Sequence, residues 1–421
     1  MNSLSRPDKT TQYTLLVIST LTVMAGATIA PALPSMQVHF ADQPHADFWV
    51  KMVLTLPGLF IVLGAYVAGL LIDRTSKKMV LLVSILLYAL AGGSGLIADT
   101  LVGVLIGRAV LGLGVAGIMT TVITLVADYY SGAERAKVLG LQSSFMALGG
   151  VIFLSLGGFL ADIHWRMPFA IYLSAAILVP LAWKYILEPQ EYPSSRSSTE
   201  PAEAPVSTLR LIKLLMFIYG LTIAAQILFY TIPIHLPFHL QSIVGAGGAE
   251  SGLAIALVTL FSGLTALMYS RIRERVGYVR IMSLAFTLIG LGFLLLGVAK
   301  SYVVFIPGLM SIGVGFGMFI PNVNTWIADV APARYRGRII GGITTFVFLG
   351  QFLSPIVTQS IQKQIGVSGL YLGAGLFLLS SALVMLARRN ALILLCRHVM
   401  HPKTKPVPPQ TKRYELVQSN P

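Results

Sequence analysis

The stretch Gly69-Leu70-Leu71-Ile72-Asp73-Arg74-Thr75-Ser76-Lys77-Lys78 is a short charged turn between two long apolar runs. Such a turn belongs at a membrane surface, with its basic residues on the cytoplasmic side. Gly69 lacks a side chain, so a neighbouring helix could approach closely there. Asp73 follows the end of one helix and could face the positive N-terminus of another. The stretch therefore predicts a latch between two helix bundles; the alternative is a topology anchor alone.

The composition is that of a protein embedded in a membrane. Of the 421 residues, 55% are hydrophobic and 11% are charged, and the mean hydropathy is +0.79, which excludes a soluble globule. Apolar runs of about 20 residues, each able to cross about 30 Å of hydrocarbon as a helix, recur along almost the whole chain. Strand-like alternation is absent, which excludes a barrel. We expect an all-α integral membrane protein.

The distribution of charge gives the expected orientation. The net charge is +14, and most of the 30 Lys and Arg fall in loops on the same side as the N-terminus when loops are assigned alternately. This is the positive-inside bias, so it indicates topology before any nucleic-acid partner. Both termini are therefore expected in the cytoplasm, in a multi-pass protein of the cytoplasmic (inner) membrane. An even number of spans follows.

The apolar runs predict twelve spans in two sets of six, separated by a flexible linker rich in Pro, Ser, Glu and Ala. The expected division is a cytoplasmic tail at 1–12, a six-helix bundle at 13–187, the linker at 188–213, a second six-helix bundle at 214–387 and a basic cytoplasmic tail at 388–421. The predicted spans are 13–33, 48–71, 79–98, 101–129, 138–161, 167–187, 214–234, 251–270, 281–299, 303–330, 339–361 and 370–387.

The two halves repeat each other with one constant offset. At this offset Gly112 and Asp128 fall on Gly313 and Asp329, and the Asp73-Arg74 pair falls on Glu274-Arg275. A single register across both halves predicts two pseudo-symmetric bundles.

Four motifs carry a resemblance to a known family. The stretch from Gly69 to Lys78 resembles the loop signature G-x-L-x-D-R-x-G-R-K of the major facilitator superfamily, except that Ser76 replaces the second glycine. Residues 30–36, 108–114 and 165–169 resemble motifs of its bacterial 12-helix drug exporters, which are drug–proton antiporters. Phe153-Leu154 stand where the antiporters have Gly-Pro, although Gly157 and Gly158 are kept. The resemblance implies the major facilitator fold.

Arg108 lies inside the fourth predicted span, where an unpaired guanidinium costs several kcal/mol. By resemblance it matches an arginine implicated in proton coupling or substrate binding. The alternative is a structural arginine that binds carbonyl groups. Both interpretations stay open.

Acidic residues are missing from the middle of the spans, since all 16 Asp and Glu fall in loops, tails or helix ends. Organic-cation transporters commonly use a buried acid. A cavity with Arg108 and no acid is therefore expected to prefer neutral or anionic solutes.

Each half has an acid at the cytoplasmic end of its fourth span, Asp128 and Asp329. We expect Asp128 to pair with Arg74 and Asp329 to pair with Arg275, as the family's charge relay does. The expected gate or latch residues are Gly69, Asp73, Arg74, Lys77, Lys78, Asp128, Glu274, Arg275 and Asp329.

Polar and aromatic side chains inside spans are candidates for the substrate cavity, because facing lipid would waste their hydrogen bonds. The alternative for each is interhelical hydrogen bonding, worth about 0.6 kcal/mol or a little more. The candidates are Gln142, Ser143, Gln226, Phe229, Tyr230, Asn322, Asn324, Trp326 and Thr345.

The leading functional prediction is a secondary active transporter, not an enzyme, which exports small organic molecules by alternating access. Its expected partners are a small-molecule substrate and the lipid bilayer; it acts as a monomer and binds no nucleic acid. No cofactor or metal is expected, and the proton gradient is the driving force. One alternative is an exporter of an endogenous anionic metabolite such as a carboxylate siderophore. Another is a membrane sensor or scaffold without transport.

Overall fold

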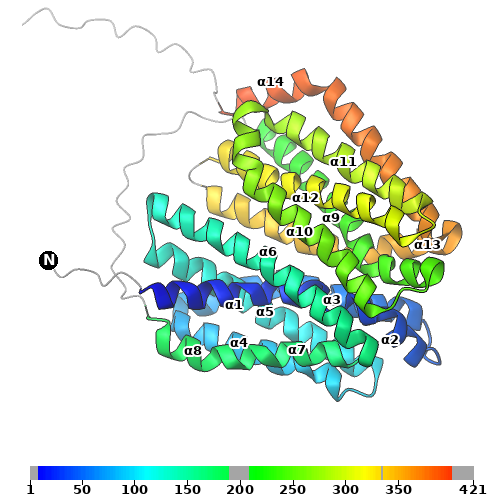
Figure 1. The fold of residues 1–421 in the computed structure, drawn as a ribbon. Coiled ribbons are helices and arrows are strands. Elements are labelled where there is room, and N and C mark those ends of the chain that lie inside the picture. Colours follow the sequence, from blue (N-terminus) through cyan, green and yellow to red (C-terminus); the bar gives the residue numbers. More distant parts are fainter. Residues whose placement is uncertain (1–7, 189–207, 333–334, 401–421) are drawn as a thin grey trace, which may run out of the picture.

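The structure is a computed structural model that describes residues 8–188, 208–332 and 335–400. These residues form helices and turns and include no strand. In Figure 1 the helices of the first half, α1 to α8, lie below those of the second half, α9 to α14. The all-α prediction is confirmed.

The N-terminal half contains six spans, of which the first and the sixth are broken by 3₁₀ turns. Pro31 in η1 and Pro34 at the start of α2 lie at the break in the first span, and Pro168 lies in η3, where the sixth span begins. The elements are α1 (Lys9–Ala27), η1 (Ala30–Ala32), α2 (Leu33–His39), α3 (Ala46–Arg74), α4 (Lys77–Gly93), η2 (Ser94–Leu96), α5 (Leu101–Tyr129), α6 (Gly132–Ile163), η3 (Met167–Phe169), α7 (Ala170–Leu173), η4 (Ser174–Ile177) and α8 (Leu178–Tyr185).

The C-terminal half contains longer helices: α9 (Thr208–Val244), α10 (Gly248–Arg275), α11 (Tyr278–Val298), α12 (Tyr302–Val330), α13 (Arg336–Ala387) and α14 (Arg389–Met400). Across the described residues, 11 helical segments are long and apolar enough to span a membrane. The last of them, 51 residues long, contains Gly366, whose φ of 73° is left-handed and breaks the helix. The break divides this segment into two passages, so the described residues contain the twelve predicted spans.

The structure departs from the predicted division of the chain at the linker and at the C-terminal tail. Helix α9 begins at Thr208, inside the predicted linker, and α14 occupies part of the predicted tail. Pro233 and Pro237 lie inside the seventh span, and α9 continues through both. His235 lies within hydrogen-bond distance of Thr358 Oγ1, at 3.0 Å, so this segment is held by α13.

The molecule has two ends that matter for function. We call the end that carries the start of α1, the α3–α4 turn and α14 the terminal end, and the other the opposite end (Figure 1). The halves meet closely where α6 crosses α10. A Cβ added to Gly158 would lie 2.6 Å from the Gly248 carbonyl oxygen and 3.0 Å from Gly252 Cα. Glycine is therefore required for this contact between the halves.

Candidate functional site

A cavity of about 310 Å³ lies between the two halves. Its walls come from α1, α3, α5 and α6 on one side and from α9, α10, α12 and α13 on the other. Three of the predicted cavity residues, Gln226, Phe229 and Tyr230, line it. Its volume lies at the small end of the range of ligand pockets.

The two walls differ in chemistry. The N-terminal wall is aliphatic and includes Met119 and Met146; its polar member, Thr22, donates its hydroxyl hydrogen to the carbonyl of Ser19. The C-terminal wall carries four aromatic rings and the amide and hydroxyl side chains. None of the described lining residues is charged. The full aromatic and polar set of the C-terminal wall is Gln226, Phe229, Tyr230, Thr259, Ser262, Phe316, Phe348 and Gln351.

The other predicted cavity residues do not line this cavity. Gln142 donates to Ser19 Oγ at 3.0 Å, and Asn322 donates to the carbonyl of Tyr278 at 3.0 Å, so both connect helices. Trp326 is buried and stacks on Tyr278. Ser143 and Thr345 donate to carbonyls of their own helices, and Asn324 is exposed. Gln142 and Asn322 thus make interhelical hydrogen bonds of the kind named as the alternative.

Arg108 is 1% exposed and lies outside the cavity lining. Its Nε donates to the carbonyl of Val53 at 2.8 Å, and Nη2 donates to the carbonyl of Ala25 at 2.6 Å. Its Nη1 donates to the hydroxyl of Tyr172 at 3.0 Å. The guanidinium thus joins α5 to α1, α3 and α7, which is the structural interpretation of this residue.

The two carbonyls are available because their own helices cannot use them. The helical donor for the Val53 carbonyl would be the N–H of residue 57, and Pro57 has none. Ala25 lies in the last turn of α1, where carbonyls lack intrahelical donors. A buried arginine without a carboxylate is therefore satisfied by two helix irregularities.

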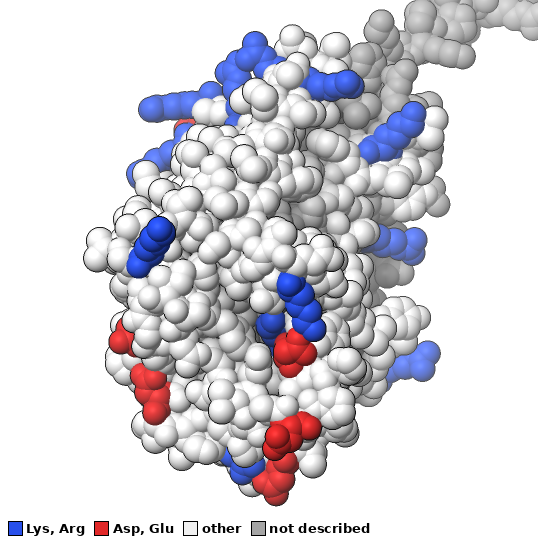
Figure 2. Space-filling view, turned by 90° about the vertical axis from the view of Figure 1, so that its right-hand side faces the viewer, with Lys and Arg blue, Asp and Glu red and all other residues white. Residues whose placement is uncertain are grey.

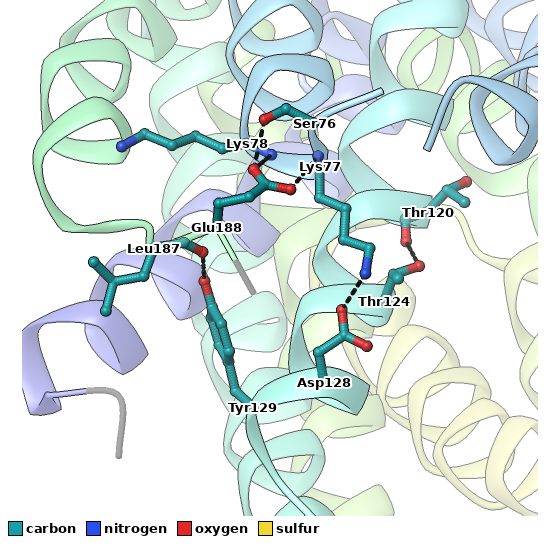
Figure 3. Close-up of polar contacts among 9 residues, drawn as sticks. All are labelled: Ser76, Lys77, Lys78, Thr120, Thr124, Asp128, Tyr129, Leu187 and Glu188. Atoms are coloured by element: carbon teal, nitrogen blue, oxygen red, sulfur yellow. Dashed lines mark hydrogen bonds and ion pairs between the residues drawn. The ribbon is translucent and has the colours of Figure 1, made fainter. Parts of the chain in front are cut away.

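The first latch, made of Gly69 to Lys78 and Asp128, has a different pairing from the prediction. Lys77 Nζ lies 2.8 Å from Asp128 Oδ2 (Figure 3), so the predicted pair of Asp128 with Arg74 is wrong. Asp73 and Arg74 belong to the last turn of α3 and are exposed. A Cβ added to Gly69 would meet nothing within 4 Å, so no helix approaches it in this structure.

Glu188, predicted to begin the linker, instead caps the N-terminus of α4 (Figure 3). Its carboxylate accepts hydrogen bonds from Ser76 Oγ at 2.5 Å and from the amides of Lys77 and Lys78 at 2.8 and 2.9 Å. Partial burial raises the pKa of Glu188, but these bonds and the charge of Lys77 outweigh it and hold the pKa below its usual value. The role expected of Asp73, an acid at a helix N-terminus, is taken here by Glu188.

The second latch, made of Glu274, Arg275 and Asp329, also has an unexpected partner. Tyr278, which stands at the repeat position of Lys77, donates its hydroxyl hydrogen to Asp329. The guanidinium of Arg273 lies 3.7 Å from the ring centre of Tyr278. The predicted pair of Asp329 with Arg275 is therefore wrong, and Glu274 and Arg275 are exposed.

At the opposite end, the two halves are joined by polar side chains that the sequence analysis did not identify. Asp47 of α3 lies 2.7 Å from Lys363 Nζ and accepts a 2.7 Å hydrogen bond from Gln359, both on α13. Lys51, one turn further along α3, is 5% exposed and lies 3.3 Å from Gln362 Oε1. Figure 2 looks onto this end, where most of the surface is uncharged and basic and acidic side chains meet beside a hollow.

A second such contact joins α6 to α10. Asp162, at the end of α6, accepts hydrogen bonds from the backbone amides of Gly248 and Ala249 at the start of α10. These hydrogen bonds and this ion pair between the halves all lie at the opposite end. The only sequence signal for this network was the i, i+4 spacing of Asp47 and Lys51.

Comparison with known families places the chain among membrane transporters. A family model described as the Major Facilitator Superfamily matches residues 15–248 and 218–418. The chain is 27% identical over 303 residues to Multidrug resistance protein 1 of Bacillus subtilis (strain 168), covering 69% of this chain and 75% of that protein. It is 23% identical over 360 residues to the Bacillibactin exporter of the same organism, covering 81% and 87%.

The fold also matches solved structures. The inward-open xylose transporter XylE from E. coli superposes with a TM-score of 0.73 at 14% identity, covering 89% of this chain and 95% of that one. At this identity the match establishes the fold and no more.

Proposed function

Because the chain belongs to the Major Facilitator Superfamily, we propose that it is a secondary transporter that exports small organic molecules by alternating access. The observation that supports this is the cavity between the halves, combined with the polar contacts that join the halves at the opposite end. Such an arrangement fits one state of a cavity that opens alternately to the two sides. Multidrug resistance protein 1 and the other exporters among its relatives favour the outward direction.

The proposed orientation places the terminal end, and both termini, in the cytoplasm. The positive-inside bias supports it, because Lys77, Lys78, Arg271 and Arg275 all lie at that end. In this orientation the polar network of Asp47, Lys51 and Lys363 closes the outer side. The structure then corresponds to a state that faces inward.

We propose that the latch residues act in the alternate, outward-facing state. Asp73, Arg74 and Gly69 make no polar or close contact with described residues here, and Glu274 and Arg275 are likewise exposed. Their turns would approach helices of the other half when the terminal end closes. In the present state, the ion pair of Lys77 with Asp128 and the hydrogen bonds of Glu188 stabilise the α3–α4 turn.

The energy source in this proposal is the proton gradient. Described carboxylates are absent from the cavity lining, so protons would be exchanged at residues nearer the ends, among which Asp47 already lies between the halves. Arg108, with every contact directed at carbonyls and a tyrosine, contributes by holding helices in place.

Inside-out membrane vesicles from an expression host test the proposal. We expect vesicles that contain the protein to accumulate a radiolabelled lipophilic drug when the interior is acidified, and an uncoupler to abolish the accumulation. Vesicles from the same host without the protein provide the comparison. Accumulation equal to that of empty vesicles, for a broad solute panel, would contradict transport; accumulation insensitive to the uncoupler would contradict proton coupling alone.

A second candidate is export of an anionic endogenous metabolite, which the similarity to the Bacillibactin exporter favours. The uncharged cavity opposes it, because an anion would enter without a cationic partner. Comparing the medium of producing cells with and without the chain separates the two: secretion of a chelator that the deletion strain retains would support this candidate.

A further inference from the structure

We infer that the cavity selects an uncharged amphiphile, which lies with its apolar part against the N-terminal wall and its hydrogen-bonding part against the C-terminal wall, where Gln226 is the determinant of specificity. The inference rests on the proposed function, since it names the substrate class of the same site.

Gln226 is the first reason. Its side chain borders the cavity and is 4% exposed, yet its Oε1 has no hydrogen-bond partner, and no described residue bonds to its amide nitrogen. A buried carboxamide without partners is costly, and native structures rarely leave one without a reason. A polar group carried by the substrate is the missing partner.

The position of this carboxamide is fixed by packing. A Cβ added to Gly350 of α13 would lie 2.7 Å from the Gln226 Cβ, so α13 presses closely against this part of α9. Restricted side chains discriminate between ligands better than mobile ones, because less freedom is lost on binding. Gln226 is therefore both unpaired and held in place.

The surroundings of Gln226 reinforce the assignment. Three further polar side chains line the cavity: Tyr230, Ser262 and Gln351. None of them makes a side-chain hydrogen bond to another residue that the structure describes. All of them belong to the C-terminal half. The polar half of a substrate would find donors and acceptors on this wall, together with the rings of Phe229 and Phe316, which lie 4.0 Å apart.

The N-terminal wall offers the opposite chemistry. Leu54, Ile61 and Leu154 provide aliphatic surface, and the thioethers of Met119 and Met146 adapt to different shapes. Thr22 directs its hydroxyl hydrogen to its own helix. An apolar substituent of variable shape therefore fits this side, whereas a second polar group would lose its hydration without replacement.

The cavity lining excludes both cationic and anionic substrates. A cation would meet no carboxylate in the lining, and an anion would not reach Arg108, whose donors are directed at Val53, Ala25 and Tyr172. Burial of an ion without a partner is far more costly than burial of a neutral hydrogen-bonding group.

The test uses four probes and purified full-length protein. Phenyl-naphthylamine is neutral and carries one N–H donor; its N-methyl derivative lacks the donor; anilinonaphthalene sulfonate adds a negative charge; ethidium is a cation. Equilibrium binding is measured by scintillation proximity with radiolabelled probes and displacement by unlabelled probe. We expect the wild-type chain to bind the N–H compound about tenfold more tightly than the N-methyl compound and to bind both ions more weakly still.

Three variants assign the discrimination to Gln226. Gln226→Leu should bind the N–H and N-methyl compounds equally, because the acceptor is gone while the packing volume is kept. Gln226→Glu should gain affinity for ethidium, since it puts one negative charge into an uncharged lining. Gln364→Leu, an exposed glutamine of α13 away from the cavity, is the matched control and should behave as the wild type.

The inference is overturned if Gln226→Leu keeps the preference for the N–H compound, if the wild type binds the sulfonate as tightly as the neutral amine, or if the folded wild type binds neither neutral probe. Flux of phenyl-naphthylamine into proteoliposomes is measured separately. Selective binding without flux would leave the inference standing and contradict the proposed function, whereas flux of an anion by an unselective cavity would do the reverse.

Discussion

The role of Arg108 in this structure follows from the backbone groups that it binds more than from its charge. Arg108 could be located in a span from the sequence, but its partners could not, because two of them are carbonyl groups of residues far apart in the chain. Pro57 stands inside the second predicted span, yet nothing in the sequence connects it with Arg108. Gln226 was a candidate cavity residue and borders the cavity, while the unpaired state of its Oε1 could be seen only in the structure.

The hydrogen bonds of Arg108 predict the effect of removing it. Arg108→Ala leaves the carbonyls of Val53 and Ala25 buried without donors, each at a cost of about 1–3 kcal/mol, so we expect less inserted protein and a lower unfolding temperature. Arg108→Lys keeps one donor group, so its amount of inserted protein and its unfolding temperature should lie between those of the wild type and of Arg108→Ala. Quantified membrane protein and thermal unfolding check this; an Arg108→Ala protein that is stable but inactive would assign the residue to coupling instead.

Glu188 predicts a dependence on pH. Its folded pKa is lowered, so its contribution to stability is present above its usual pKa of 4.5 and is lost as the pH falls through the folded value. Glu188→Gln should cost about 0.3–1 kcal/mol at neutral pH, the scale of a charge at a helix N-terminus, and the difference from the wild type should vanish in acid. Unfolding temperatures of both proteins across pH 3–7 (roughly the range in which a carboxylate titrates) measure it. A difference that persists in acid would exclude the charge as the cause.

At the scale of elements, hydrophobic periodicity predicted the spans well because each must fill the thickness of a bilayer. It missed the break between α1 and α2, but it separated the two passages of α13 between residues 361 and 370, where Gly366 has a left-handed φ. The latch pairings failed for another reason. A turn of ten residues offers several basic side chains to one acid, and the end of α3 rotates Arg74 away while the start of α4 brings Lys77 to Asp128.

The two latches predict unequal effects of mutation. Asp73→Asn and Glu274→Gln should both insert normally, because both side chains are exposed in this structure. We expect Asp73→Asn to abolish flux and Glu274→Gln to reduce it less, since the second turn has Tyr278 and Val279 in place of Lys77 and Lys78. Flux per inserted molecule is the measurement. Equal losses would show that the two turns contribute alike, and normal flux in Asp73→Asn would remove it from the latch.

For the whole molecule, the repeat predicted two related bundles, and it correctly placed their acids in equivalent positions. It did not predict where the halves touch, because contacts across the pseudo-symmetry axis depend on which state the molecule occupies. The charged network of Asp47, Lys51 and Lys363 and the cap of Asp162 on α10 join residues from different halves, which no periodic pattern connects.

The crossing of α6 and α10 predicts a conformational effect. Gly158→Ala should disfavour closure of the opposite end, because its Cβ would lie 2.6 Å from the carbonyl oxygen of Gly248. Gly140→Ala, on the same helix with no atom within 4 Å, is the control. In a Cys396→Ser background, a cysteine at Ser262 should react faster with an impermeant thiol reagent from the opposite end in Gly158→Ala. Equal rates in the two variants would contradict the prediction.

The partners of Arg108 also set an order for biosynthesis. Spans enter the membrane as they leave the ribosome, so α5 arrives after α1 and α3, which supply the Ala25 and Val53 carbonyls, and before α7, which supplies Tyr172. The arginine can thus be accommodated as soon as it is synthesised, with its third contact added later. A nascent chain cut after residue 129 keeps both carbonyl acceptors, whereas one that starts at α4 has neither, and only the first has a native means of retaining α5 in the bilayer.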